Sequence, residues 1–314
     1  MCKRENIIGC ISTDFFLIPC NIAFIFPIFV KKTTPMSKKL SLLFVCILLL
    51  FAETQAQTIN VMTFNIRLNT ESDKENRWDL RKENAASMLR FYDIDICGMQ
   101  EAFVGQIKDV QNQLSNYDYV GKGRDDGKEA GEYSPIFYRK DKFVLLETQT
   151  FWLSQTPDVP SKGWDANYNR VVTWAKFKDK KSKKSFYVFN THFDHKGEIA
   201  RQESAKMLIK VVKTIAKSEK AIIIGDFNST PQQQPYKLLN EALINTKFIT
   251  ETPHFGPQST FNGFETKEID GMEIDHIFLN TKTIAVKKHA TLSNTWAGRF
   301  ASDHHAVMVQ LELK

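Results

Sequence analysis

The chain has 314 residues, of which 25% are charged and 42% hydrophobic, and its formal net charge is +6. So mild a positive charge does not by itself argue for a nucleic-acid partner. Of the five cysteines only Cys97 lies beyond residue 56, which excludes a disulfide framework within that part. Its roughly 258 residues must rely on their own core or on bound metal, and that length suits one large domain.

The N-terminal region has the layout of a secretory signal. Residues 40–52, LSLLFVCILLLFA, form an apolar run that follows two lysines. The small residues Thr54 and Ala56 stand just before Gln57, where a signal peptidase favours small side chains. A run of this length falls short of the about 20 residues that a membrane span needs. We predict that translation starts at Met36 and that cleavage follows Ala56.

Residues 1–56 are therefore predicted to be a signal peptide region, and residues 57–314 an exported domain that is periplasmic, attached to the cell surface or secreted. Removing residues 1–56 takes away six basic and three acidic residues, so the net charge falls to +3. The alternative is that residues 15–30 pair with the second apolar run to form a membrane anchor.

Beyond residue 57 the pattern alternates between predicted strands and helices. Strands are predicted over 58–66, 93–99, 134–140, 143–152, 170–178, 184–192, 220–225, 275–280, 283–292 and 305–313, and helices over 77–91, 104–115, 197–217 and 232–243. Many strands with few helices indicate two packed sheets with helices outside.

Two features lie between these elements. Thr230 and Pro231 predict a clean start to the fourth helix, as N-cap and first-turn residues. The basic run KDKKSKK at 178–184 is interpreted as a solvated hairpin tip, with a phosphate-binding patch as the alternative.

Polar residues stand at the ends of several predicted strands, where the strand pattern does not require them. A single Asp after a strand usually shapes a turn or caps a helix, but six coincident strand ends indicate a common site. The residues are Asn65, Gln100, Glu101, His192, Asp194, His195, Asp226, Asn228, Asp275, His276, Asp303, His304 and His305.

Carboxylate and amide oxygens predominate in this set, and no thiolate cluster accompanies them. They suit a hard cation, Mg²⁺ first, with Mn²⁺ or Ca²⁺ as alternatives. Zinc at His192 and His195 is disfavoured, because residues three apart on an extended segment point to opposite faces. His276 is interpreted as a core histidine.

The same set suits hydrolysis at phosphorus. The chain lacks the Gly-x-Ser-x-Gly elbow of serine hydrolases. A divalent metal beside an Asp–His pair suits in-line attack of water on a phosphoester, since the metal neutralises phosphate oxygens while the carboxylate orients the His.

The motifs TFNIR, GMQE, NTHFDH, GDFNSTP, IDHIF and SDHHAV follow one another in this order. The ordered set resembles the endonuclease/exonuclease/phosphatase superfamily, whose members include DNase I, abasic-site endonucleases, neutral sphingomyelinases, inositol polyphosphate phosphatases and deadenylases. The resemblance covers roughly residues 58–314. It implies an α/β fold, a DNase I-like four-layer α/β/β/α sandwich of two mixed sheets, and metal-dependent hydrolysis of phosphoesters.

The resemblance also implies a metal site. Glu101 is similar to the main metal ligand of the family, with Asn65 beside it on metal or phosphate. Asp303 resembles a second carboxylate on the metal side. His304 resembles the general base, and Asp275 its orienting partner.

Other residues match the family's phosphate-binding positions. Asp226 and Asn228 resemble the pair that positions the nucleophile and stabilises the pentavalent phosphate. His192 resembles a His beside the leaving oxygen or phosphate. By similarity to DNase, Glu132 is expected to pair with His192, and Arg170 to contact phosphate; a surface salt bridge and a strand-edge charge are the alternatives.

Trp296 is a further candidate for substrate binding, because it precedes the SDHHAV motif and an aromatic ring can stack on a base or sugar. We predict an exported, metal-dependent enzyme of one domain that hydrolyses phosphoesters as a monomer, first as a phosphodiesterase or nuclease. The alternatives are a phosphomonoesterase, a lipid-headgroup phosphodiesterase and an inactive binding module.

Overall fold

The computed structural model describes residues 58–313, which fall within one contact unit, Gln55–Lys314. The predicted signal peptide region, with the start at Met36 and cleavage after Ala56, lies outside the described residues. Within the described part, no helix combines the length and apolar character needed to cross a bilayer.

The first sheet has six strands in the order β11-β14-β1-β2-β4-β3. It is mixed, because β1 pairs in parallel with β2 while the other neighbours are antiparallel. Its strands are β1 (Thr58–Asn65), β2 (Ile96–Gln100), β3 (Tyr117–Val120), β4 (Ile136–Arg139), β11 (Ile284–Leu292) and β14 (Ala306–Leu313).

The second sheet also has six strands, in the order β5-β6-β7-β8-β10-β9, and β7 and β8 form its parallel pair. Its strands are β5 (Phe143–Trp152), β6 (Val171–Asp179), β7 (Ser185–His192), β8 (Ala221–Asp226), β9 (Ile244–Asn245) and β10 (Asp275–Leu279). A separate hairpin pairs β12 (Thr295–Trp296) with β13 (Arg299–Phe300).

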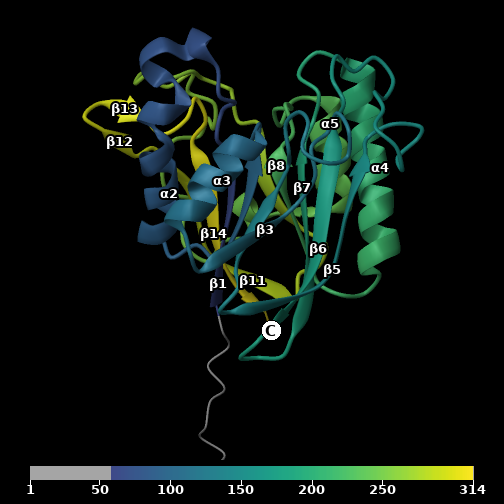
Figure 1. Cartoon of the computed structure of the whole chain (residues 1–314). Helices are drawn as coiled ribbons and strands as arrows, with labels where there is room; N and C mark the ends of the chain where they lie inside the picture. The colour runs from purple at the N-terminus through teal and green to yellow at the C-terminus, as the bar shows by residue number, and fades with distance from the viewer. Residues whose placement is uncertain (1–57, 314) are drawn as a thin grey trace, which may run out of the picture. The chain divides into compact units, whose positions relative to one another are not determined.

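Helices cover the outer face of each sheet (Figure 1). Outside the first sheet lie α2 (Lys82–Phe91) and α3 (Val104–Gln113), and outside the second lie α4 (Glu198–Ala216) and α5 (Gln234–Ala242). Residues 58–313 also contain three short 3-10 helices: η1 (Glu71–Asn76), η2 (Trp78–Leu80) and η3 (Thr246–Phe248).

The hydrophobic core divides into three clusters that match this layering. One joins the first sheet to α2 and α3 through residues such as Met62 and Leu89. The second lies between the sheets, where Val61 and Ile224 are buried. The third joins the second sheet to α4 and α5. The predicted four-layer α/β/β/α sandwich of two mixed sheets is therefore confirmed.

A polar bridge links the two sheets close to one edge. Gln100 Nε2 donates to Asn190 Oδ1 at 2.6 Å, and Asn190 Nδ2 donates to the carbonyls of Met99 and Pro135. A Cβ on Gly98 would lie 2.6 Å from Asn190 Cγ. Gly98 therefore allows the sheets to approach closely enough for this bridge.

Most predicted elements are present with shifted ends, but the predicted start of the fourth helix, at residue 232 with Thr230 as N-cap, is wrong. The helix begins at Gln234 after Gln233, with Pro235 in its first turn. Thr230 instead opens a turn, because Gln233 N donates to its carbonyl at 3.0 Å. The basic run at 178–184 forms the predicted β6–β7 hairpin tip, where Asp179 accepts hydrogen bonds from Lys181 N and Ser182 N.

Candidate active site

Strand direction brings the predicted site residues to one edge of the sandwich. Strands β1, β2, β7 and β8 end there, and the antiparallel strands β10 and β14 begin there. Sheet pairing places Asp275 opposite Asp226, and His192 opposite Asp226 on the other side. The side chains from both sheets line one pocket of about 850 Å³.

Three residues of this pocket adopt left-handed backbone conformations just after their strands. The φ angles are 56° at Arg67, 60° at Glu101 and 44° at Asn228. Such conformations cost non-glycine residues roughly 1 kcal/mol or more and persist only where their surroundings enforce them. Each of these strands is therefore followed by a strained turn that carries a polar side chain of the pocket.

Asn65 connects the two sheets at the pocket floor. Its Nδ2 donates to Glu101 Oε1 at 3.1 Å and to Asp226 Oδ2 at 3.0 Å. Its Oδ1 accepts a hydrogen bond from Arg67 N at 3.0 Å. Asn65 is thus a donor to two carboxylates, and only the second lone pair of Oδ1 is left for the predicted contact with metal or phosphate.

His304 and Asp275 form a buried pair. His304 Nδ1 lies 2.8 Å from Asp275 Oδ2, and Thr260 Oγ1 donates to the same oxygen at 2.6 Å. Because a carboxylate oxygen accepts, Nδ1 carries the proton. The other ring nitrogen, Nε2, then lies 3.8 Å from Asp226 Oδ2. This is the orientation expected of a general base held by its carboxylate partner.

The electrostatics of this pair are set by several neighbouring carboxylates. Burial alone would lower the pKa of His304, but the negative charge of Asp275, its hydrogen bond and the charge of Asp226 outweigh burial and raise the pKa well above its usual value. Burial, followed by repulsion from Asp275, raises the pKa of Asp226 to about 7. Neutralising these carboxylates would lower the pKa of His304.

The pocket fits a hard divalent cation. Glu101 and Asp303 both line it, and burial raises the pKa of Asp303, with the charge of Glu101 raising it further. Asp275 Oδ1 is buried without a hydrogen-bond partner among the described residues. This excess of buried carboxylate oxygens is the donor chemistry that Mg²⁺, Mn²⁺ and Ca²⁺ prefer.

A second group of ligand atoms lies deeper in the same site. One atom each from Asp226, Asp275 and His304 falls within 4.8 Å of the others. Since Asp275 already accepts from His304 Nδ1 and does not line the open pocket, we favour Glu101 and Asp303 as the ligands of a metal that also meets substrate.

Arg170 determines the protonation of His192. Arg170 Nη1 lies 2.8 Å from His192 Nδ1, and a guanidinium only donates, so Nδ1 accepts and the proton sits on Nε2. On that side Nε2 lies 3.0 Å from Asn228 Nδ2 and 3.5 Å from Asp226 Oδ2. The amide nitrogen can only donate, so the carboxylate is the acceptor of the two. Burial and then the charge of Arg170 lower the pKa of His192 well below its usual value. His192 thus presents a neutral Nε2–H donor.

Glu132 lies beside His192, as predicted, but at ion-pair distance and not in a hydrogen bond. Glu132 Oε2 lies 3.9 Å from His192 Nδ1 but 2.5 Å from Arg124 Nη1. Arg170 takes the position that the carboxylate was expected to fill, because its guanidinium reaches His192 from the start of β6. The predicted contact of Arg170 with phosphate is also constrained, since its donors reach His192, His195 and Asp194.

Several pocket residues were not predicted as site residues. Tyr168 stacks on His195 with ring centroids 5.9 Å apart, and the guanidinium of Arg124 lies 5.0 Å from the Tyr168 ring. Arg67 also lines the pocket, beside Asp73. Arg67 ends the motif TFNIR, and Arg124 lies in the segment GKGRDDGKEAGEY at residues 121–133, so arginines close to strand ends were the available signal.

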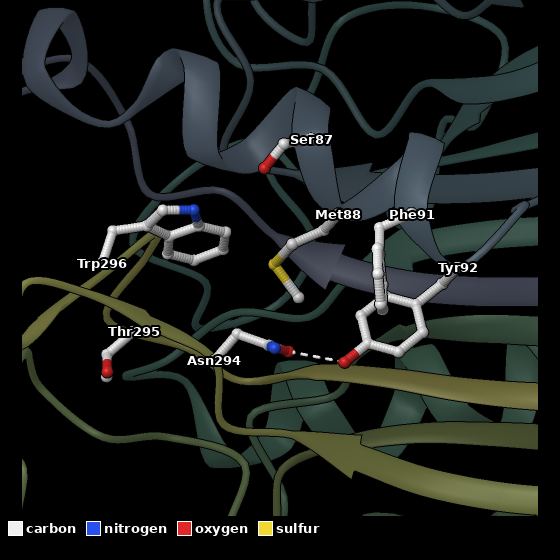
Figure 2. Close-up of a pocket in the computed structure, with 7 residues that line it drawn as sticks. All are labelled: Ser87, Met88, Phe91, Tyr92, Asn294, Thr295 and Trp296. Atoms are coloured by element: carbon white, nitrogen blue, oxygen red, sulfur yellow. Dashed lines mark hydrogen bonds between the residues drawn. The ribbon is translucent and has the colours of Figure 1, made fainter. Parts of the chain in front are cut away.

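Trp296 does not line this pocket. It borders a separate pocket of about 360 Å³ with Met88, Phe91 and Tyr92 of the α2 region, where Tyr92 Oη donates to Asn294 Oδ1 at 2.9 Å (Figure 2). The β12–β13 hairpin carries the indole against the cluster of α2 and the first sheet. By contrast, His276 is buried and its Nε2 lies 3.2 Å from the Ser229 carbonyl, as expected of a core histidine.

Comparison with known proteins identifies the family. The model of the Endonuclease/Exonuclease/phosphatase family matches residues 62–304. The chain belongs to this family. Its homologues are phosphoester hydrolases that depend on a divalent metal, so the chain is an enzyme of the phosphoesterase class.

Individual relatives span most of the chain. An endonuclease/exonuclease/phosphatase family protein from Bacteroides thetaiotaomicron is 39% identical with a TM-score of 0.79, covering 82% of this chain and 98% of that one. A mannosyl-6-phosphatase from Bacteroides thetaiotaomicron VPI-5482 is also 39% identical, with a TM-score of 0.77. The match covers 81% of this chain and 99% of that one. The exoribonuclease subunit Ccr4 of the CCR4-Not complex in Mycosarcoma maydis is 27% identical over 345 aligned residues. The alignment covers 82% of this chain and 51% of the relative.

Proposed function

We propose that this phosphoesterase is a phosphomonoesterase that acts on a phosphorylated sugar by in-line attack of water on phosphorus. The observation that carries the proposal is the 39% identity to a mannosyl-6-phosphatase over 99% of that protein. The pocket of about 850 Å³ has the size of a small-molecule site. The proposed substrate is thus a phosphomonoester, whereas the sequence alone first predicted a phosphodiester such as nucleic acid.

The catalytic roles follow from the contacts of the chain's own residues. Asp275 holds His304 with Nε2 facing Asp226, so that His304 takes the proton of the attacking water. Asn228 and Asp226 orient that water and the phosphate, and His192 donates from Nε2 to a phosphate oxygen. A divalent cation bound by Glu101 and Asp303 would supply neutralisation of phosphate charge and of the carboxylates around His304.

A second candidate is a phosphodiesterase of nucleic-acid or nucleotide type. It is favoured by the similarity to the Ccr4 exoribonuclease subunit and by the motif order in the sequence. Tyr168 is 45% exposed at the pocket and stacked on His195, which gives a base or a sugar ring a surface to stack on.

A substrate panel separates the two candidates. Purified residues 57–314 would be assayed on mannose 6-phosphate, p-nitrophenyl phosphate, bis-p-nitrophenyl phosphate, DNA and RNA, with Mg²⁺, Mn²⁺, Ca²⁺ or EDTA. The proposal predicts that monoesters give the highest kcat/KM and that EDTA abolishes turnover. Cleavage of diesters with monoesters left intact would establish the second candidate instead.

Export and a monomeric state are also proposed, on the basis of the sequence. An apolar run behind two lysines and small residues before Gln57 support processing after Ala56. N-terminal sequencing of protein collected from outside the cytoplasm tests this, and a start well upstream of Gln57 would refute it. Light scattering of the purified domain tests the monomer.

A further inference from the structure

Three arginines line the pocket, and one of them differs from the other two. Arg170 is 4% exposed and donates from all three of its nitrogens. Arg124 is 8% exposed and bonded to Glu132. The side chain of Arg67 is 29% exposed, and its Nη1 makes no hydrogen bond within residues 58–313. Arg124 Nε also lacks a hydrogen-bond partner within this range, but it is buried. Arg67 is therefore the most exposed of the three arginines, and it presents an unused Nη1 donor to the pocket.

The guanidinium of Arg67 is held rigidly in spite of its exposure. Nε and Nη2 donate to the two oxygens of Asp73, each at 3.0 Å. This bidentate geometry fixes the plane of the group. Asp73 thus occupies one edge of the fork and leaves the Nη1 edge free.

The backbone of Arg67 is fixed as well. Arg67 N donates to Asn65 Oδ1, and its carbonyl accepts from Arg81 Nη2 at 3.0 Å and Gln106 Nε2 at 2.8 Å. These partners hold the left-handed conformation with φ 56°. The same kind of strained turn presents Glu101 and Asn228, so Arg67 is displayed in the manner of the predicted site residues.

The free edge of Arg67 lies beside the carboxylates expected to bind metal. Nη1 is 3.8 Å from Glu101 Oε2, and Nε is 3.8 Å from Asp303 Oδ2. These are ion-pair distances beyond hydrogen-bond length, so the guanidinium is held near both carboxylates without a hydrogen bond to either. A phosphate that meets a cation at Glu101 and Asp303 would also be within reach of Arg67.

We propose that Arg67 binds an unesterified oxygen of the phosphoryl group and thereby selects monoesters over diesters. The inference rests on the proposed phosphomonoesterase function and extends it to a specificity-determining residue. A monoester dianion offers three unesterified oxygens and about two negative charges, whereas a diester offers two oxygens and one charge. The additional cation therefore favours the monoester, and a second ester group at that position would lose the contact.

The test compares Arg67→Gln and Arg67→Lys with the wild type on p-nitrophenyl phosphate and bis-p-nitrophenyl phosphate. Arg139→Gln is the matched control, because Arg139 also binds one carboxylate through two nitrogens, at 2.8 Å and 2.7 Å to Asp141, and lies outside the pocket. Loss of one charge-assisted hydrogen bond predicts that Arg67→Gln lowers kcat/KM for the monoester about 30-fold and for the diester less than about 3-fold.

The Lys variant, which keeps the charge without the fork, should fall between the two, and it gives the same comparison if the Gln variant does not fold. Equal losses on both substrates, or no loss, would overturn the role of Arg67. If the wild type cleaves only diesters, the proposed function fails, and Arg67 is then judged on the Kd of inorganic phosphate measured with Mg²⁺. A roughly 30-fold weaker Kd in Arg67→Gln supports the role, and an unchanged Kd refutes it.

Discussion

His304 Nδ1 lies 2.8 Å from Asp275 Oδ2, although the two residues are carried by different sheets. His304 precedes β14 of the first sheet, and Asp275 begins β10 of the second. Thr260 fixes the same carboxylate oxygen through its hydroxyl at 2.6 Å. The orientation of the predicted base therefore depends on the packing of the two sheets against each other.

Replacing His304 should remove the base without unfolding the protein. We expect His304→Gln to lower kcat by at least about 10²-fold, the usual contribution of general base catalysis. Circular dichroism would establish that the variant folds. His289→Gln is the control, since His289 is also buried but pairs with His254 away from the pocket. Activity at the wild-type level in His304→Gln would refute the assignment.

Divalent metal should stabilise the wild type through the predicted carboxylate ligands. At Mg²⁺ concentrations about 100 times Kd, binding to the folded state alone contributes about 2.7 kcal/mol to the free energy of unfolding. Glu101→Gln and Asp303→Asn should lose most of the rise in Tm on adding Mg²⁺, whereas Asp79→Asn, at an exposed carboxylate, should keep it. A full rise in Tm for both site variants would place the metal at the deeper group of Asp226, Asp275 and His304.

The buried carboxylate of Asp226 should make the metal-free fold sensitive to pH. Its pKa is raised from 3.8 to about 7, first by burial and then by Asp275. Between about pH 4 and pH 7 the folded state keeps a proton that the unfolded state has lost, so raising the pH over this window lowers the free energy of unfolding.

Asn does not titrate, so Asp226→Asn should gain stability relative to the wild type as the pH rises through that window. We expect a gain of at least about 1 kcal/mol at pH 8, since each unit of pKa shift corresponds to about 1.4 kcal/mol. Urea unfolding in EDTA at pH 4.5, 6 and 8 measures it. A difference between the two proteins that stays constant across the three pH values would contradict the raised pKa.

Arg170 should act by holding the tautomer of His192. In the metal-free protein, ¹⁵N NMR of the imidazole should show the proton on Nε2. Arg170→Gln should populate the Nδ1–H form and lower kcat by about 10-fold or more. Arg201→Gln serves as the control, because Arg201 bonds the backbone carbonyl of Asp194 and leaves His192 untouched. A proton found on Nδ1 in the wild type would refute the role of Arg170.

Strand ends were predictable from the sequence because apolar runs stop abruptly at polar residues. The strand predicted over 143–152 has those bounds in the structure. The predicted bounds of β7 and β8 are off by at most one residue at either end. The short strands β3, β9, β12 and β13 were not predicted, because runs of two to four residues carry too little periodicity. The start of α5 was missed because Thr230 and Pro231 suit a turn as well as a helix cap.

The sequence by itself determined the chemistry of the site: carboxylates, amides and histidines at strand ends, in the order typical of the family. It could do so because residue type and strand position are local properties. Which side chains bond to one another was decided only by the tertiary structure, since those distances depend on how the sheets pack. That packing put Arg170 closer than Glu132 to His192, placed Trp296 beside α2, and left Arg67 Nη1 without a hydrogen bond to any described residue.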